Sequence, residues 1–118
     1  MSSISVFRGS GMPTVFDLLE DIEKRPDMFL GWGPEERGKQ LDSLEAILMG
    51  YGHAVARHGI DEPGRNFLQS FGHFLRERYG WSESLGPIAE IRAHATSDED
   101  AWQFMWKLIR EFRSTNLE

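Results

Sequence analysis

The sequence predicts an all-α fold, a single-domain bundle of about four to five helices with an extended N-terminal arm. The chain has 118 residues, which is the usual size of one domain. Apolar residues recur at helical spacing in four long stretches joined by short connections, and no segment has a convincing strand pattern. We therefore expect an arm at residues 1–12, a helical domain at residues 13–114 and a tail at residues 115–118.

The first expected helix begins near Thr14 and ends before Pro26. Thr14 and Asp17 have the spacing of a capping box, in which side chains satisfy free amide groups at a helix start. The apolar stripe of this helix consists of Val15, Leu18, Leu19 and Ile22. A turn-rich loop with many apolar residues follows at 25–34, and the polar stretch 35–40 is expected to be exposed.

The second expected helix runs from Asp42 to about His58, and Asp42 with Glu45 repeats the capping pattern. Gly50 and Gly52 lie inside this helix, where a glycine costs about 1 kcal/mol relative to alanine. Their presence indicates either that another helix crosses closely or that the helix bends.

Three further segments complete the expected bundle. Residues 61–64 open a third helix, with Pro63 in its first turn, and Gly80 ends it. A short segment that begins at Pro87 is expected to be a helix, although a strand remains an alternative. Ser97 caps the final helix, which has acidic residues in its first turn and basic residues near its end, as the helix dipole favours.

Composition limits the possible functions. The chain has 13 Lys and Arg against 19 Asp and Glu, a net charge of −6 and no cysteine, so disulfides, thiolate metal sites and cysteine nucleophiles are excluded. The acidic balance argues against direct nucleic-acid binding, because nucleic-acid-binding proteins present clustered Lys and Arg. With no long apolar run and no secretory leader pattern, we expect a cytoplasmic protein that does not contact membranes.

No catalytic constellation is visible in the sequence. The four histidines, at 53, 58, 73 and 94, lack the i, i+4 spacing of a helical zinc site. Nucleophile-elbow and phosphate-loop motifs are absent, and the paired carboxylates lie where helix dipoles or solvent explain them. We therefore expect no enzymatic activity, no cofactor and no metal.

The string IEKRPDMFLG is similar to the RKRPGMYIG segment of the ATPase domain of type II topoisomerases. The helix that follows here lacks the Asp-Asn of that family, and no glycine-rich ATP lid is present. We interpret the string as a shared local structure, a helix ended by Arg-Pro in which Met28 and Phe29 pack back under the core.

The whole-chain layout has a different resemblance. The strings LLEDIEKRPDMFLG, GYGHAVARHG, FLQSFGHFLRERYGWSES and SDEDAWQFMWKLIREF, over residues 14–113, resemble a group of small standalone bacterial proteins. Proteins of this group often accompany secreted polymorphic toxins and are suspected immunity proteins. The resemblance implies a binding function and identifies no active residues.

A binding function requires exposed aromatic residues beside charge. Trp32 and Trp81 lie in glycine-flanked loops, where each either plugs an end of the bundle or anchors a partner; Trp106 and Phe104 lie off the centre of the final stripe, where either neighbouring helices or a partner cover them. Acidic residues at several positions would complement a basic partner. The candidate partner-binding residues are Asp17, Glu20, Asp21, Trp32, Glu35, Glu36, Trp81, Phe104 and Trp106.

The leading hypothesis is a non-enzymatic immunity protein that occludes the active surface of a cognate toxin with a basic surface, a nuclease being the natural target. One alternative is a small helical enzyme or ligand-binding protein with a pocket near Arg25, Tyr51, His53 and His58. Another is a regulatory homodimer in which Trp106 and Phe104 form a self-complementary face. The sequence leaves the oligomeric state open.

Overall fold

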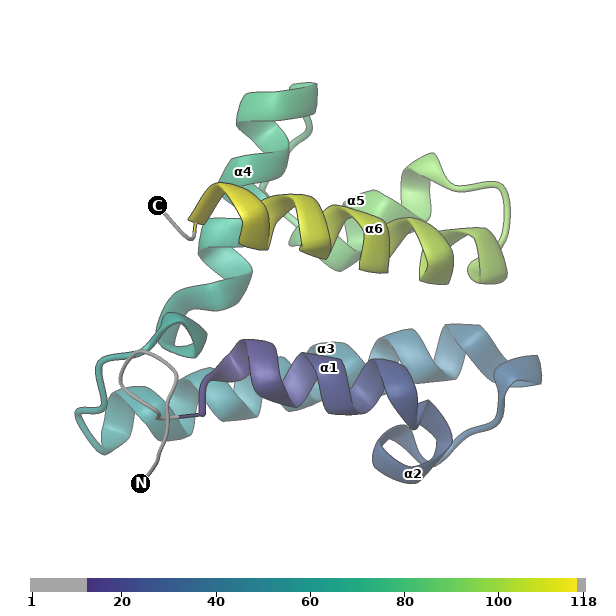
Figure 1. Cartoon of the computed structure of the whole chain (residues 1–118). Coiled ribbons are helices and arrows are strands. Elements are labelled where there is room, and N and C mark those ends of the chain that lie inside the picture. The colour runs from purple at the N-terminus through teal and green to yellow at the C-terminus, as the bar shows by residue number, and fades with distance from the viewer. Residues whose placement is uncertain (1–12, 117–118) are drawn as a thin grey trace.

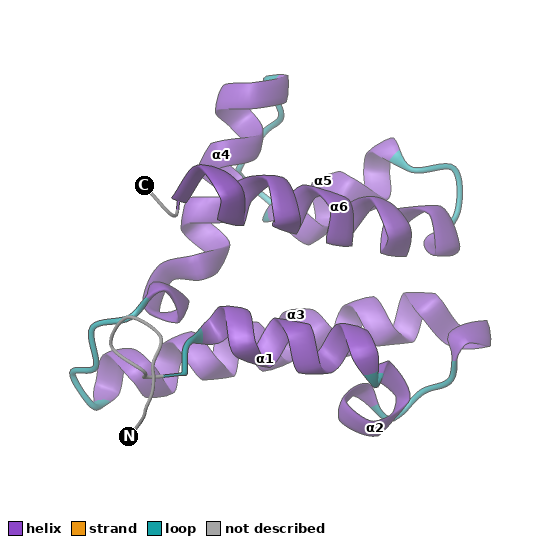
Figure 2. Ribbon diagram, viewed as in Figure 1, coloured by secondary structure: helices purple, strands orange, loops and turns teal. Residues whose placement is uncertain are grey.

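The computed structural model describes residues 13–116, and within this range the chain forms six α-helices, two short 3-10 helices and no strand (Figures 1 and 2). The predicted all-α fold is therefore confirmed. The expected arm at residues 1–12 lies outside the described residues. The elements are α1 (Val15–Lys24), α2 (Pro26–Leu30), η1 (Pro34–Glu36), α3 (Arg37–Arg57), η2 (Pro63–Asn66), α4 (Phe67–Tyr79), α5 (Pro87–His94) and α6 (Asp98–Asn116).

The helices form two halves that meet at one core. In the view of Figure 1, α1 lies in front of α3 in the lower half, and α2 lies below this pair. The upper half has α6 in front of α5, while α4 rises steeply beside them. Every α-helix contributes to the core between the halves, which includes a cluster of contacting phenylalanine rings: Phe16, Phe67, Phe71, Phe74 and Phe112.

The start of α1 is the predicted capping box. The Thr14 side chain accepts a hydrogen bond from the Phe16 amide at 3.2 Å, and the Thr14 amide donates to Asp17 Oδ2 at 2.6 Å. Pro26 ends this helix and takes the first position of α2, where its missing amide hydrogen is tolerated. The local sequence signals thus set both ends of α1.

The prediction that the second helix starts at Asp42 was wrong by five residues. The helix α3 begins at Arg37, and Asp42 is not its cap. The expectation that residues 35–40 are exposed was also wrong, since Gln40 is fully buried. Gln40 precedes Leu44 and Leu48 at intervals of four residues, so it continues the buried face of α3 toward the N-terminus. Because Gln40 is polar, the sequence pattern did not indicate that the helix includes this turn.

The two glycines inside α3 have different surroundings. A Cβ atom on Gly52 would lie 2.9 Å from the backbone oxygen of Gly64, so η2 crosses α3 closely there, as one of the two expected explanations requires. A Cβ on Gly50 would meet no atom within 4 Å. Close packing within the described chain therefore explains Gly52 and leaves Gly50 unexplained.

The last two helices show how the remaining expectations for the C-terminal part of the chain compare with the structure. The segment from Pro87 is the helix α5, not a strand. The Ser97 hydroxyl accepts a hydrogen bond from the Asp100 amide at 3.0 Å, as expected of a cap. The helix α6 continues to Asn116, so residues 115 and 116 belong to the helix and not to a tail.

Candidate protein-binding surface

Residues 27–36, which we call the Trp32 segment, combine exposed apolar side chains with acidic ones. Met28 is 66% exposed and Trp32 is 42% exposed. The expectation that Met28 packs under the core was wrong, because α2 turns Phe29 and Leu30 toward the core and leaves Met28 on the outside. Two large apolar side chains are thus exposed four residues apart in one short segment, which makes the segment a candidate contact surface.

The same segment also carries acidic residues. Asp27, Glu35 and Glu36 belong to the same segment, and Asp27 and Glu35 are exposed. Glu35 makes no ion pair with the residues that the structure describes, whereas Glu36 lies 3.8 Å from Lys39 Nζ. Lys39 Nζ also lies 4.4 Å from the centre of the Trp32 ring, a cation–π distance that limits the freedom of the indole. The segment therefore offers an aromatic anchor beside negative charge.

The backbone of the Trp32 segment is fixed from within the core. Gly31 has a φ of 80° and ends α2 with its amide bonded to the Asp27 carbonyl at 3.0 Å, a left-handed conformation that favours glycine. Gln40 Nε2 donates to the Trp32 carbonyl at 2.6 Å, and Gln40 Oε1 accepts from Arg37 Nη1 at 2.7 Å. A buried amide is stable only when such partners satisfy it, so Gln40 ties the exposed segment to α3.

Arg37 extends this connection to α6. Its guanidinium lies 4.5 Å from the centre of the Trp102 ring, and its Nε donates to Glu99 Oε1 at 2.8 Å. Hydrogen bonds from Gln103 and Arg37 hold the pKa of Glu99 below its ordinary value. A continuous set of hydrogen bonds and ring contacts thus runs from Trp32 through Gln40 and Arg37 to α6.

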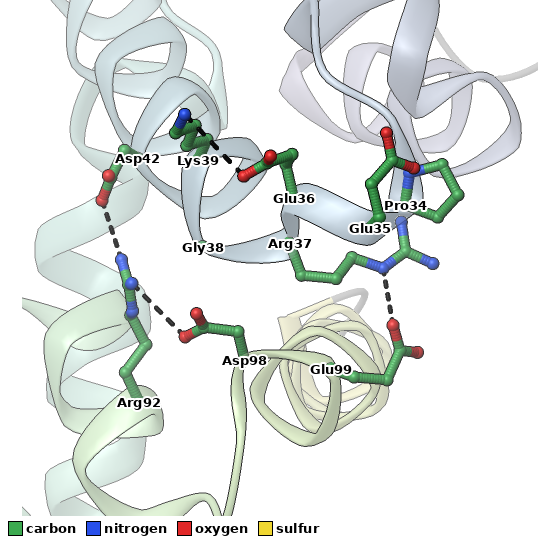
Figure 3. Close-up of a pocket in the computed structure, with 10 residues that line it drawn as sticks. All are labelled: Pro34, Glu35, Glu36, Arg37, Gly38, Lys39, Asp42, Arg92, Asp98 and Glu99. Carbon is green, nitrogen blue, oxygen red and sulfur yellow. Dashed lines mark hydrogen bonds and ion pairs between the residues drawn. The ribbon is translucent and has the colours of Figure 1, made fainter.

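A shallow cavity of about 420 Å³ adjoins the Trp32 segment (Figure 3). Five carboxylates and three basic groups line it, and Arg92 bridges Asp42 at 2.7 Å and Asp98 at 3.4 Å. Most of the charged groups in this lining are engaged in ion pairs, and the described lining includes no histidine, serine or threonine. The lining residues are Pro34, Glu35, Glu36, Arg37, Gly38, Lys39, Asp42, Arg92, Asp98 and Glu99. Charges that are paired with one another in this way do not form a nucleophile–base arrangement.

The predicted acidic residues of α1 lie in a separate place and are partly engaged in the fold. Asp17 belongs to the capping box, and Glu20 Oε2 accepts from Arg113 Nη1 at 2.6 Å, which links α1 to α6. Asp21 is exposed. Glu20 lines a groove between α1 and α6, whereas Glu35 and Glu36 line the cavity of Figure 3, so the structure places Glu20 at a different pocket from these two residues.

Trp106 is a core residue. The expectation that it contacts a partner was therefore wrong, and so was the alternative in which Trp106 and Phe104 form a homodimer face. It is 4% exposed because α1 packs beside it, and Phe16 and Leu19 lie along the same groove. Phe104 is half-buried and meets the edge of Trp81 at 6.0 Å. The two residues do not form a common exposed face.

Trp81 is half-buried in an aromatic stack. Its ring centre lies 5.0 Å from that of Tyr79 and 4.2 Å from that of His94, nearly parallel in both cases. Two stacked rings of the same chain therefore engage the indole, so Trp81 is less free than Trp32 to anchor a partner.

The residues expected for a small-molecule pocket do not converge. The Tyr51 hydroxyl donates to Glu62 Oε1 at 2.7 Å, and burial together with this carboxylate raises the pKa of Tyr51 to about 12. Glu62 also accepts from the amides of Val15 and Gly64 and so organises the start of α1 and η2. Arg25 follows the opposite end of α1, roughly 15 Å away at 1.5 Å per residue.

Both histidines of that expected pocket, His53 and His58, are exposed. Among residues 13–116, no group of three or more His, Cys, Asp or Glu side chains is arranged to hold a metal ion. None of the described helices has the length and apolar character that crossing a membrane requires.

Comparison of the chain with protein-family models, curated proteins and solved structures found no match.

Proposed function

We propose that this chain is a non-enzymatic binding protein that neutralises a cognate bacterial toxin by covering its active surface with the Trp32 segment. The observation that carries the proposal is the exposure of Met28 and Trp32 on a segment whose backbone is held by the buried Gln40. Aromatic and methionine side chains are enriched at protein interfaces. A segment that is already ordered loses less conformational entropy on binding than a flexible one.

The charge of the segment favours a basic partner. Asp27 and Glu35 are exposed in the same segment as the apolar side chains, and the whole chain carries a net charge of −6. Complementary charge accelerates the encounter of two proteins, while buried aromatic anchors slow their dissociation. A nuclease toxin fits this description, because its substrate groove must be basic to bind nucleic acid. The layout resemblance to suspected immunity proteins supports the same class of partner.

Co-expression with the protein encoded by the neighbouring gene tests the proposal. We expect the neighbour to be toxic when expressed alone and harmless when expressed with this chain. Met28→Ala and Trp32→Ala should each reduce this protection. Leu85→Ala is the matched control, because Leu85 is 73% exposed in the loop between α4 and α5 and is not part of the Trp32 segment.

Two outcomes contradict the proposal. One is a neighbour that is harmless by itself or equally lethal with and without this chain. The other is a loss of protection in Leu85→Ala as large as that in Trp32→Ala, with all variants folded to the same extent by circular dichroism.

A further inference from the structure

The side of α3 that faces away from the core is exposed, with the Asp42–Arg92 ion pair at one end, and it is not strongly charged at its middle. Its residues recur at helical spacing over four turns, opposite the buried Leu44 and Leu48, and all are exposed. Met49, at the middle of this face, is 62% exposed. The α3 face consists of Asp42, Ala46, Met49, Gly50, His53 and Arg57.

Gly50 has no role that the described chain explains. Its surroundings are open, so an alanine would fit there without contact, and its backbone φ is not in the left-handed region. Glycine nevertheless lowers the stability of a helix interior. A glycine at an exposed helix position is useful when the backbone of another molecule approaches closely.

The charges at the two ends of the α3 face are self-complementary. Asp42 and Arg57 lie at equal distances, roughly 11 Å at 1.5 Å per residue, on either side of the midpoint between Met49 and Gly50. Two antiparallel copies of α3 that cross at this midpoint place each Asp42 near Arg57 of the other copy. In the same register the two Gly50 residues meet at the crossing, and the two Met49 side chains pack against each other.

Both charged groups have capacity for such a contact. Arg57 makes no ion pair within residues 13–116, and its side chain is exposed. Asp42 is mostly exposed and uses Oδ1 for Arg92, which leaves Oδ2 free to accept from a second arginine. A shallow crossing angle near 20°, a common class of helix packing, keeps the ends of the two helices close enough for these side chains to meet.

We infer that a second copy of this chain packs antiparallel on the α3 face and forms a two-fold symmetric homodimer. Such an interface is isologous, which requires the self-complementarity that Asp42 and Arg57 provide. A single pair of helices buries less area than a standard protein interface, so the dimer should dissociate on dilution. The inference does not depend on the proposed toxin partner, because the α3 face shares no residue with the Trp32 segment.

Sedimentation equilibrium of the full chain tests this inference. We expect a monomer–dimer equilibrium whose dissociation constant rises at least tenfold in Met49→Glu, because the change places two carboxylates beside the two-fold axis. Leu85→Glu is the control, since it introduces the same charge at an exposed apolar side chain outside both the α3 face and the Trp32 segment. It should leave the dissociation constant within about twofold.

Two further sets of variants distinguish the contact from a general effect of charge. Gly50→Ala should weaken the dimer while raising the thermal stability of the dilute monomer, a pair of opposite effects that a purely structural role does not produce. Arg57→Asp and Asp42→Arg should each weaken the dimer, and the double variant should restore it to within about threefold of wild type.

A chain that stays monomeric at millimolar concentration overturns the inference. A dimer that is unchanged by Met49→Glu also overturns it, as does a double charge exchange that restores nothing.

Discussion

Replacing Gln40 with methionine isolates the hydrogen bonds that hold the Trp32 segment. Methionine has a similar length and volume, so the change leaves no large cavity at this fully buried position. It removes the donor to the Trp32 carbonyl at 2.6 Å and the acceptor of the Arg37 hydrogen bond at 2.7 Å. The variant therefore reports on polar contacts more than on packing.

The structure indicates the size of the effect. A hydrogen bond to a charged group contributes about 1.5–3 kcal/mol, and a carbonyl left without its partner costs about 1–3 kcal/mol. Burial of the apolar methionine side chain offsets part of this loss. We expect the free energy of unfolding to fall by about 2–4 kcal/mol in Gln40→Met.

Urea denaturation followed by circular dichroism measures this change. Gln69→Met makes the same substitution at an exposed glutamine of α4 and should change the free energy of unfolding by less than about 0.5 kcal/mol. A Gln40→Met protein as stable as wild type, within the same margin, refutes the assignment of Gln40 as the residue that fixes the segment.

Three other changes follow from the described contacts. Gly52→Ala should destabilise the protein by about 1–3 kcal/mol in urea denaturation, because its Cβ would lie 2.9 Å from the backbone oxygen of Gly64, which cannot easily move. Gly50→Ala, with open space around it, should stabilise the monomer by up to about 1 kcal/mol. If both alanine variants are less stable than wild type, the two glycines do not differ in their surroundings as described. Since the pKa of Tyr51 is raised from 10.0 to about 12 beside Glu62, the folded state keeps a proton that the unfolded state loses above pH 10. The free energy of unfolding should therefore fall as pH rises from 10 to 12, and Tyr51→Phe should reduce that slope; an equal slope in both proteins argues against this contact.

The ends of helices were predicted correctly where the signal consists of residues within one turn of each other. The capping box of Thr14 and Asp17, the break at Pro26 and the cap at Ser97 lie where they were expected. Each of these signals acts through hydrogen bonds or steric limits within one turn of chain. Elements defined in this way need no information about distant segments.

The start of α3 shows where local signals fail. Gln40 appears polar in the sequence, yet it is buried because its two partners, the Trp32 carbonyl and Arg37, satisfy its amide. The position continues the spacing of the apolar stripe, and that periodicity was the one signal that pointed to burial. The residue type outweighed the spacing, and five residues of helix were missed.

The candidate surface depends on which helices cover which faces, and that is a property of the whole fold. Met28 was expected inside and lies outside, whereas Trp106, a candidate contact residue, lies inside under α1. Both residues belong to apolar runs with no sequence feature that distinguishes the covered side from the open one. The glycine-flanked loop position also left both readings open, since Trp32 is exposed and Trp81, in a similar loop, is half-buried against Tyr79 and His94.

Isothermal titration calorimetry of this chain against the purified product of the neighbouring gene tests the central claim most directly. We expect binding by the wild-type chain, a dissociation constant about 30-fold higher or more for Trp32→Ala, as for an interface hot spot, and no significant change for Leu85→Ala. Absence of binding by the wild-type chain, or equal affinity of the wild-type and Trp32→Ala proteins, contradicts it.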